Sequence, residues 1–150
     1  MAQNPRLSVK ERDRRYSLLR QQLRQRGIDC TIVSGSNLFY LGNGIPGELY
    51  GFLTTDEKPF TVIVNRRHLV DVPVQVLIDA QEWVGDFKPG NDAAPLIEKI
   101  KELGLEKGTV GLSGGISYRF TMQLQSALPA AKIVDVTDLF TDVRTLKSAE

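Results

Sequence analysis

The second half of the chain alternates helical and strand patterns, and this alternation constrains the fold more than any other feature. The patterns predict, in order, a helix over 93–103, a strand over 109–113, a helix over 117–128, a strand over 132–136 and a helical stretch over 137–143. Strands separated by helices of about ten residues require crossover connections, which place helices on both faces of a sheet. The pattern therefore predicts an α/β fold.

Capping signals predict where these helices begin and end. Asn91 or Asp92 is expected to cap the first helix, and Gly104 is expected to end it in a left-handed conformation. Ser117 is expected to cap the second helix and Thr137 the third. The helix boundaries are thus predicted from side-chain chemistry as well as from apolar spacing.

The first half of the chain begins with a helix, a short turn and a strand. Ser8-Val9-Lys10-Glu11 is a capping box, in which the serine hydroxyl accepts from the glutamate amide. The helix behind it has an apolar face formed by Tyr16, Leu19 and Leu23. Gly27 is expected to end this helix, and a buried strand is expected over 28–34.

An antiparallel hairpin is expected to join this sheet. Its arms are 49–54 and 60–64, and its turn is 56–59. The apolar segment 69–78 contains a proline and is expected to be irregular or a short helix, and a short strand is expected over 82–87. Together these elements predict a three-layer α/β/α domain with a mixed sheet of five or six strands.

Glycine and serine are frequent between the first strand and the hairpin. Ser36 is expected to cap a short helical turn over 37–41, and four of the six residues in 42–47 are glycine or proline. The loop over 41–50 carries Glu48 and Tyr50. Long loops of this kind usually act on something outside their own domain, although a plain connection is the alternative.

The chain offers little material for a catalytic site of its own. His68 is the only histidine, and the serines that follow strands, Ser34, Ser36 and Ser113, do not lie in a Gly-x-Ser-x-Gly elbow. The acidic residues are scattered rather than clustered at metal-ligand spacing. The glycine turn at 111–115 lacks the Lys-Ser/Thr of a phosphate-binding loop, so a plain strand-to-helix turn is expected.

Charge and cysteine content bear on partners and compartment. Residues 1–26 hold eight of the 19 basic side chains and two acids, which predicts a solvated helix face, with nucleic-acid binding as the alternative. Cys30 is the only cysteine, so an intrachain disulfide is impossible and a buried structural thiol is expected. No apolar run approaches the ~20 residues of a membrane helix. We therefore expect a cytoplasmic protein without a membrane or nucleic-acid partner.

Four segments together resemble the creatinase, prolidase and aminopeptidase P family. Residues 15–29 resemble the opening helix that ends in "RGID" before an apolar strand, and 36–42 resemble the "N-x-x-Y-L-(T)-G" segment without its usual threonine. Residues 134–136 and 144–150 resemble the "vD" and "R-x-(I/L)-K-S-x-E" segments at which the family's catalytic domain begins. Ser148 followed by Glu150 is also a helix-start signature, so a further domain is expected to follow.

The resemblance implies a domain organisation. Residues 1–7 would be disordered or irregular, 8–143 would form an N-terminal domain with a ribonuclease H-like fold, and 144–150 would begin the linker to a C-terminal "pita-bread" catalytic domain. In the family that domain holds two divalent metal ions, of the manganese, cobalt or zinc class. The N-terminal domain would close the active-site mouth and help to build a homodimer, and no catalytic or metal-ligating residue is expected within it.

The resemblance also implies residues that shape the substrate site. The candidates for substrate gating that it implies are Tyr40, Glu48 and Tyr50. We add His68 as a further candidate because it lies just past the predicted hairpin. The parent enzyme would be an Xaa-Pro dipeptidase or aminopeptidase acting on small peptides. A creatinase, an ectoine-derivative hydrolase, a dimethylsulfoniopropionate lyase or a non-catalytic protein-interaction module remain alternatives, since Gly44–Glu48 departs from the family's "T-G-F" continuation.

Overall fold

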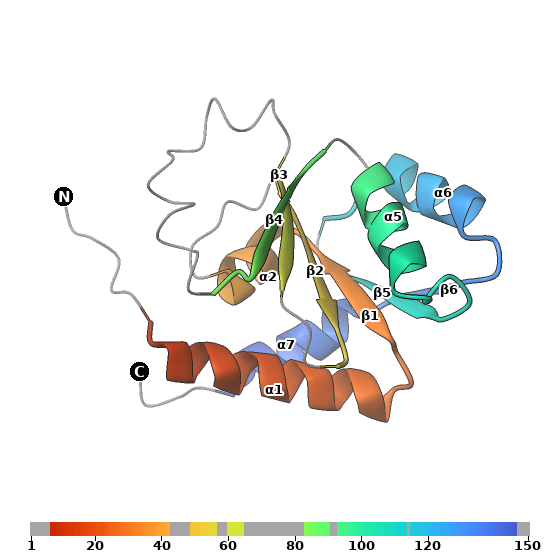
Figure 1. Cartoon of the computed structure of the whole chain (residues 1–150). Coiled ribbons are helices and arrows are strands. Elements are labelled where there is room, and N and C mark those ends of the chain that lie inside the picture. Colours follow the sequence, from red (N-terminus) through yellow and green to blue (C-terminus); the bar gives the residue numbers. More distant parts are fainter. Residues whose placement is uncertain are drawn as a thin grey trace.

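The computed structural model describes residues 7–42, 49–56, 60–64, 83–90, 93–113 and 115–146 (Figure 1). Within these residues six strands form one sheet in the order β4-β3-β2-β1-β5-β6. The strands are β1 (Cys30–Val33), β2 (Tyr50–Thr54), β3 (Thr61–Val64), β4 (Asp86–Pro89), β5 (Thr109–Ser113) and β6 (Lys132–Asp135). The sheet is mixed, as the sequence predicts.

Both kinds of strand pairing occur in this sheet. Strands β1, β5 and β6 run parallel to one another, and β3 runs parallel to β4. Strand β2 is antiparallel to both of its neighbours, with Tyr50 opposite Ile63 and Val33 opposite Gly51. The predicted hairpin is thereby confirmed, and it places the loop side of β2 at the end of the sheet where β1 leads into helix α2 (Gly35–Leu41).

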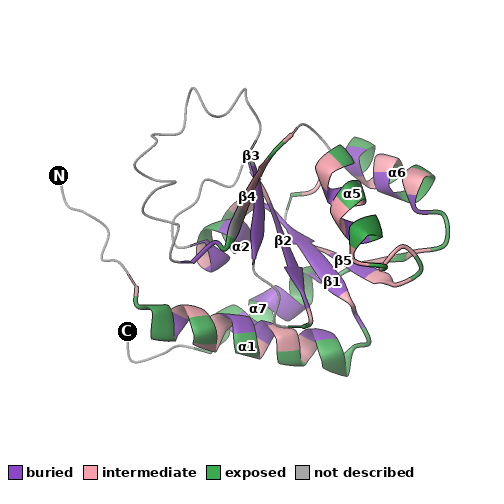
Figure 2. Cartoon of the chain, viewed as in Figure 1, coloured by how far each residue is buried: buried purple, intermediate pink, exposed green. Residues whose placement is uncertain are grey.

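Helices cover both faces of the sheet (Figures 1 and 2). Helix α2 lies on one face with α1 (Val9–Gln25) and α7 (Thr137–Thr145), and α5 (Ala94–Glu102) and α6 (Tyr118–Ala127) lie on the other. Each face has its own apolar core. Because side chains alternate along a strand, Ile32 of β1 packs into the α5–α6 core and Val33 packs into the α1–α2–α7 core. The predicted three-layer α/β/α architecture is confirmed.

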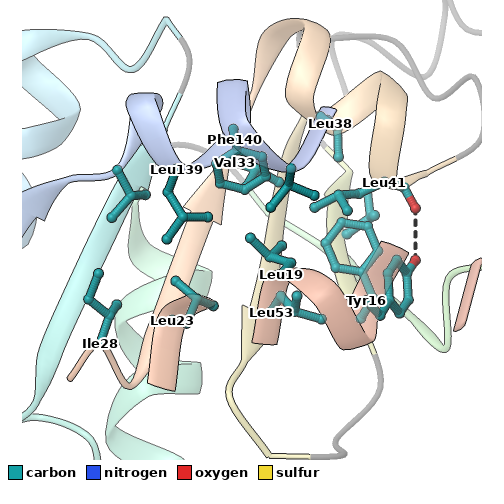
Figure 3. Packing of buried hydrophobic residues seen from close by; sticks show 14 of the residues in the cluster. Tyr16, Leu19, Leu23, Ile28, Val33, Leu38, Leu41, Leu53, Leu139 and Phe140 are labelled. Atoms are coloured by element: carbon teal, nitrogen blue, oxygen red, sulfur yellow. Dashed lines mark hydrogen bonds between the residues drawn. The ribbon is translucent and has the colours of Figure 1, made fainter. Parts of the chain in front are cut away.

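Several predicted helix signals act as expected. The Ser8 hydroxyl accepts from the Glu11 amide at 3.1 Å, and the Ser117 hydroxyl accepts from the Phe120 amide at 3.1 Å. Gly27 follows α1 with φ 69°, a backbone conformation that glycine adopts without a Cβ penalty. The apolar face of α1 packs onto the sheet through Leu19 and Leu23 (Figure 3).

Two predicted caps differ from the structure. Ser36 lies inside α2, whose N-cap is Ser34, because Gly35 turns the chain with φ 64°. Thr137 is the first residue of α7 rather than its cap, since the Asp135 carboxylate accepts from the amide and the hydroxyl of Thr137 at 3.0 and 2.6 Å. An aspartate two residues before an exposed amide caps it well.

The remaining differences concern the cap of α5 and the position of β4. The N-cap of α5 is Ala93, and the predicted caps at 91 and 92 lie outside the described residues. The strand predicted over 82–87 begins only at Asp86, because Trp83 and Val84 are buried in a turn that the Gly85 amide ties to the carbonyl of Phe60 at 3.0 Å. The predicted segments 42–47, 56–59 and 69–78 lie largely or wholly outside the described residues.

Within the described ranges, no helix combines the length and the apolar character that crossing a bilayer requires. Cys30 is a free cysteine and is fully buried, as predicted. Burial raises the pKa of its thiol to about 12. The thiol is therefore protonated at neutral pH and serves as an apolar core group.

Candidate functional site

Helix α2 presents Tyr40, the predicted gating residue that the structure places at a cluster of charged side chains. Its ring lies 4.0 Å from the guanidinium carbon of Arg15 and 5.9 Å from that of Arg144, measured to the ring centroid. Cations at these distances are attracted to the face of an aromatic ring. We call the group of residues around it the Tyr40 cluster, which consists of Glu11, Arg14, Arg15, Asn37, Tyr40 and Arg144.

Helix α1 holds the C-terminal end of α2 in place. The Arg15 Nη1 atom donates to the Tyr40 carbonyl at 2.6 Å, and the Tyr16 hydroxyl donates to the Leu41 carbonyl at 2.8 Å (Figure 3). The same hydroxyl lies 2.8 Å from the Trp83 carbonyl. The last carbonyls of a helix have no partner inside the helix, so these contacts satisfy groups that α2 itself leaves open.

Glu11 orients the two arginines of the cluster. Its carboxylate accepts from Arg14 Nε at 2.8 Å and from Arg15 Nε at 2.9 Å, although the glutamate side chain is only 3% exposed. The spacings of three and four residues put all three side chains on one side of α1. A buried carboxylate is tolerated because two guanidinium groups pair with it.

The Tyr40 hydroxyl is a buried polar group next to the guanidinium groups of this cluster. The side chain is half-buried, and among the described residues its buried hydroxyl has no hydrogen-bond partner. Burial raises the pKa of this phenol, while the charges of Arg15 and Arg14 act in the opposite direction. The group is therefore neutral near pH 7 and is able to donate or accept one hydrogen bond.

Arg144 joins the cluster from the last turn of α7. Its Nη1 atom donates to the Ser36 hydroxyl at 3.1 Å and to Asn37 Oδ1 at 3.2 Å. Arg14 holds the same end of α7 by donating from Nη2 to the Leu146 carbonyl at 3.3 Å. Two of the sequence motifs, the one around Asn37 and the one that begins at Arg144, thus meet in space.

The structure does not bring Tyr40 and Tyr50 together. Tyr40 packs against the α1–α2–α7 core, whereas Tyr50 packs against the α5–α6 core on the opposite face of the sheet. The Tyr50 ring stacks on Phe120 with 4.4 Å between ring centroids. The other two predicted gating residues, Glu48 and His68, lie outside the described residues.

The arginines of α1 contact their own domain more than the sequence predicts. Arg20 Nε donates to the Thr54 carbonyl at 3.1 Å, and Arg26 Nη1 lies 3.0 Å from both carboxylate oxygens of Asp138. This ion pair lowers the pKa of Asp138. The predicted solvated face is therefore only partly correct, because several guanidinium groups tie α1 to β2 and α7.

The described residues do not provide a metal centre. No group of three or more histidine, cysteine, aspartate or glutamate side chains within them is placed to hold a metal ion. The Glu11 carboxylate is already paired with two arginines. We therefore assign no metal ligand to this part of the chain.

Sequence reasoning proposed Tyr40 as a gating residue, which stays a prediction, and it missed the residues that surround Tyr40. Arg15 and Arg144 are both part of recognised motifs, yet nothing in their spacing reveals that their side chains approach one ring. The sequence did contain one usable signal. Glu11 is followed by arginines three and four residues later on the same helix, and oppositely charged side chains at these spacings form ion pairs.

Comparison with known proteins gives a consistent family match. Residues 15–146 match the family model described as the creatinase/prolidase N-terminal domain. A creatinase from Bacillus sp. (strain B-0618) is 27% identical over 153 aligned positions, which cover 97% of this chain and 36% of that protein. The chain therefore spans about a third of the length of this curated relative.

Solved structures share the same fold. A prolidase from Thermococcus sibiricus superimposes with a TM-score of 0.73 at 16% identity, covering 96% of this chain and 39% of that chain. An aminopeptidase P (Xaa-Pro aminopeptidase) from Streptococcus thermophilus gives a TM-score of 0.65 at 20% identity, covering 89% of this chain and 98% of that one. The second match concerns a solved chain that consists almost entirely of this fold.

Proposed function

Because the chain belongs to the creatinase/prolidase N-terminal domain family, we propose that it is the accessory domain of a longer metallohydrolase, in which it gates substrate entry and supports a homodimer. The parent would hydrolyse Xaa-Pro peptides with two divalent metal ions bound in its C-terminal domain. The partial coverage of the longer relatives supports this proposal. Its partners would be that catalytic domain, a second copy and a small peptide substrate, in the cytoplasm.

The Tyr40 cluster is the observation that carries the gating role. It combines a neutral phenol that has no partner among the described residues with three guanidinium groups and a single carboxylate. Such a surface favours a carbonyl or carboxylate oxygen of a ligand. It also lies beside Leu146, so a domain that follows α7 would begin next to Tyr40.

The accessory role is tested by comparing the present chain with the full-length polypeptide. We expect the purified 150-residue chain to show no hydrolysis of Xaa-Pro dipeptides with manganese, cobalt or zinc, and the full-length protein to hydrolyse them. Turnover by the isolated chain, with an independent preparation excluding contaminants, would contradict the proposal. So would a full-length protein that binds no divalent metal.

The gating role is tested by Tyr40→Phe in the full-length protein. Loss of the hydroxyl removes one hydrogen bond to the ligand, so we expect KM to rise about tenfold while kcat stays within about twofold. Tyr118→Phe is the matched control, because Tyr118 is 79% exposed on α6. Equal KM values for the two variants would assign Tyr40 a purely structural role.

The 27% identity with a creatinase favours a second candidate. In that case the parent would act on a small guanidino compound rather than on a peptide. Assaying the full-length protein on creatine and on Xaa-Pro dipeptides in parallel separates the two candidates, since a shared scaffold does not determine the substrate.

A further inference from the structure

Helix α2 is held at both ends by arginines from helices that are distant in the sequence. At its C-terminal end, Arg15 of α1 binds the Tyr40 carbonyl. At its N-terminal end, Arg144 of α7 binds Ser36 and Asn37. The helix is short, and short helices depend on tertiary contacts for their stability. Its orientation is therefore set by these two arginines and by the core beneath it.

The Arg144 contact is suited to fixing orientation. Asn37 is 5% exposed, so its side-chain oxygen is largely removed from water and depends on a partner inside the protein. A single Arg144 nitrogen reaches two side chains of the first turn of α2, while its guanidinium carbon lies 5.9 Å from the Tyr40 ring centroid. One side chain thus contacts both the beginning of α2 and the ring near its end.

Arg144 also lies where α7 leads out of the described fold. Leu146 is the C-cap of α7, with an extended backbone, and its side chain is exposed. The Leu146 carbonyl is bound by Arg14, which shares the Glu11 carboxylate with Arg15. The end of α7 and the end of α2 are therefore connected through one set of hydrogen bonds and ion pairs.

We propose that Arg144 is a positioning residue that couples the orientation of α2, and with it Tyr40, to helix α7. A displacement of α7 relative to the sheet would move Arg144 and release the first turn of α2. The functional consequence, an effect of the α7 position on substrate binding at Tyr40, rests on the proposed accessory role. The coupling between α7 and α2 does not depend on that role.

The coupling is tested in the present chain by amide hydrogen exchange. Arg144→Met removes the donors but keeps an extended side chain, so we expect exchange of the α2 amides to accelerate about tenfold, consistent with loss of a hydrogen bond to a charged group. Amides of α5 and α6 should keep their wild-type rates. Arg144→Lys should restore part of the protection, because a lysine supplies a charge and donors at a similar reach.

Arg119→Met is the matched control, since Arg119 is an exposed arginine on α6, the helix opposite α2. It should leave exchange of α2 unchanged. Uniform acceleration in all helices of Arg144→Met would show a general loss of stability and overturn the proposal. Unchanged exchange in α2 would overturn it as well.

A second readout in the full-length protein separates this inference from the proposed function. Arg144→Met should raise KM for an Xaa-Pro dipeptide several-fold more than it lowers kcat, because binding geometry rather than chemistry is perturbed. If the full-length protein hydrolyses no dipeptide while α2 still loses protection in the isolated chain, the proposed function fails and the coupling stands. If the enzyme is active and α2 protection is unchanged, the coupling fails.

Discussion

Replacing Glu11 by glutamine tests the central claim about the Tyr40 cluster, that a buried carboxylate orients its arginines. The substitution keeps the size and shape of the side chain and removes its charge. The Arg14 and Arg15 side chains are 29% and 13% exposed, so neither is free to become fully hydrated where it lies. We therefore expect the protein to lose stability rather than to relax at no cost.

The expected magnitude follows from the contacts. Glu11 accepts from Arg14 Nε and Nη2, each at 2.8 Å, and from Arg15 Nε at 2.9 Å. Hydrogen bonds to charged groups contribute roughly 1.5–3 kcal/mol each. The glutamine side chain keeps one acceptor oxygen, but its NH2 group replaces the other oxygen and places a donor against a guanidinium group. A loss of about 2–4 kcal/mol in the free energy of unfolding is expected, because one partner of a buried ion pair is neutralised.

The assay is urea unfolding monitored by the fluorescence of Trp83, the only tryptophan, which is 2% exposed in the fold. Asp13→Asn is the matched control on the same helix, since it makes the same chemical change at a carboxylate that is 62% exposed and pairs with Arg12. Such a surface pair contributes about 0–1 kcal/mol. If Glu11→Gln costs no more than Asp13→Asn, the Glu11 carboxylate does not organise the cluster and the reasoning is refuted.

Three further predictions concern the core and one helix cap. The thiol of Cys30 has its pKa raised to about 12 in the fold, so folding favours its protonated form. That contribution to the free energy of unfolding is complete below the ordinary thiol pKa of about 8.5 and is lost as pH rises toward 12. Cys30→Val should therefore flatten the decline of the unfolding free energy measured between pH 8.5 and 10. An unchanged decline would contradict this. Gly51→Ala should cost about 1–3 kcal/mol in urea unfolding, because the new Cβ would lie 2.5 Å from Cζ of the buried Phe60 ring; full stability would show that the ring has room to move. Ser117→Ala should cost about 1 kcal/mol by removing the hydroxyl that caps α6, whereas Ser126→Ala, an exposed site within the same helix, should cost nothing; equal effects would argue against the cap.

Local signals predicted most of the secondary structure correctly. Strand β5 has the bounds that the apolar pattern predicts, and the Ser117 cap needs only an amide three residues away. The errors arose where two local signals compete. Trp83 and Val84 have strand-like side chains, but they fill the core from a turn. The Asp135 carboxylate binds the first amide of α7 from two residues before Thr137, the residue that sequence reasoning expected to be the cap.

Site prediction was limited by which face of the sheet each residue occupies. Tyr40 and Tyr50 flank one loop in the sequence, yet they pack against opposite cores. Side chains alternate along a strand, so a shift of one residue moves an aromatic ring through the sheet. Proximity in sequence therefore did not predict which tyrosine would join the arginines.

The amino-acid sequence determined the order of helices and strands, because caps, glycine turns and apolar periodicity act over a few residues and are readable in any context. The resemblance to the family came separately, from four short motifs in the expected order. Only the tertiary structure decided that Arg144 meets Asn37, although 107 positions separate them, and that Glu11 is buried between two guanidinium groups. Such contacts depend on the order of strands in the sheet and on the angle at which α1 and α7 cross it. No local pattern encodes that geometry, since it results from the packing of the whole core.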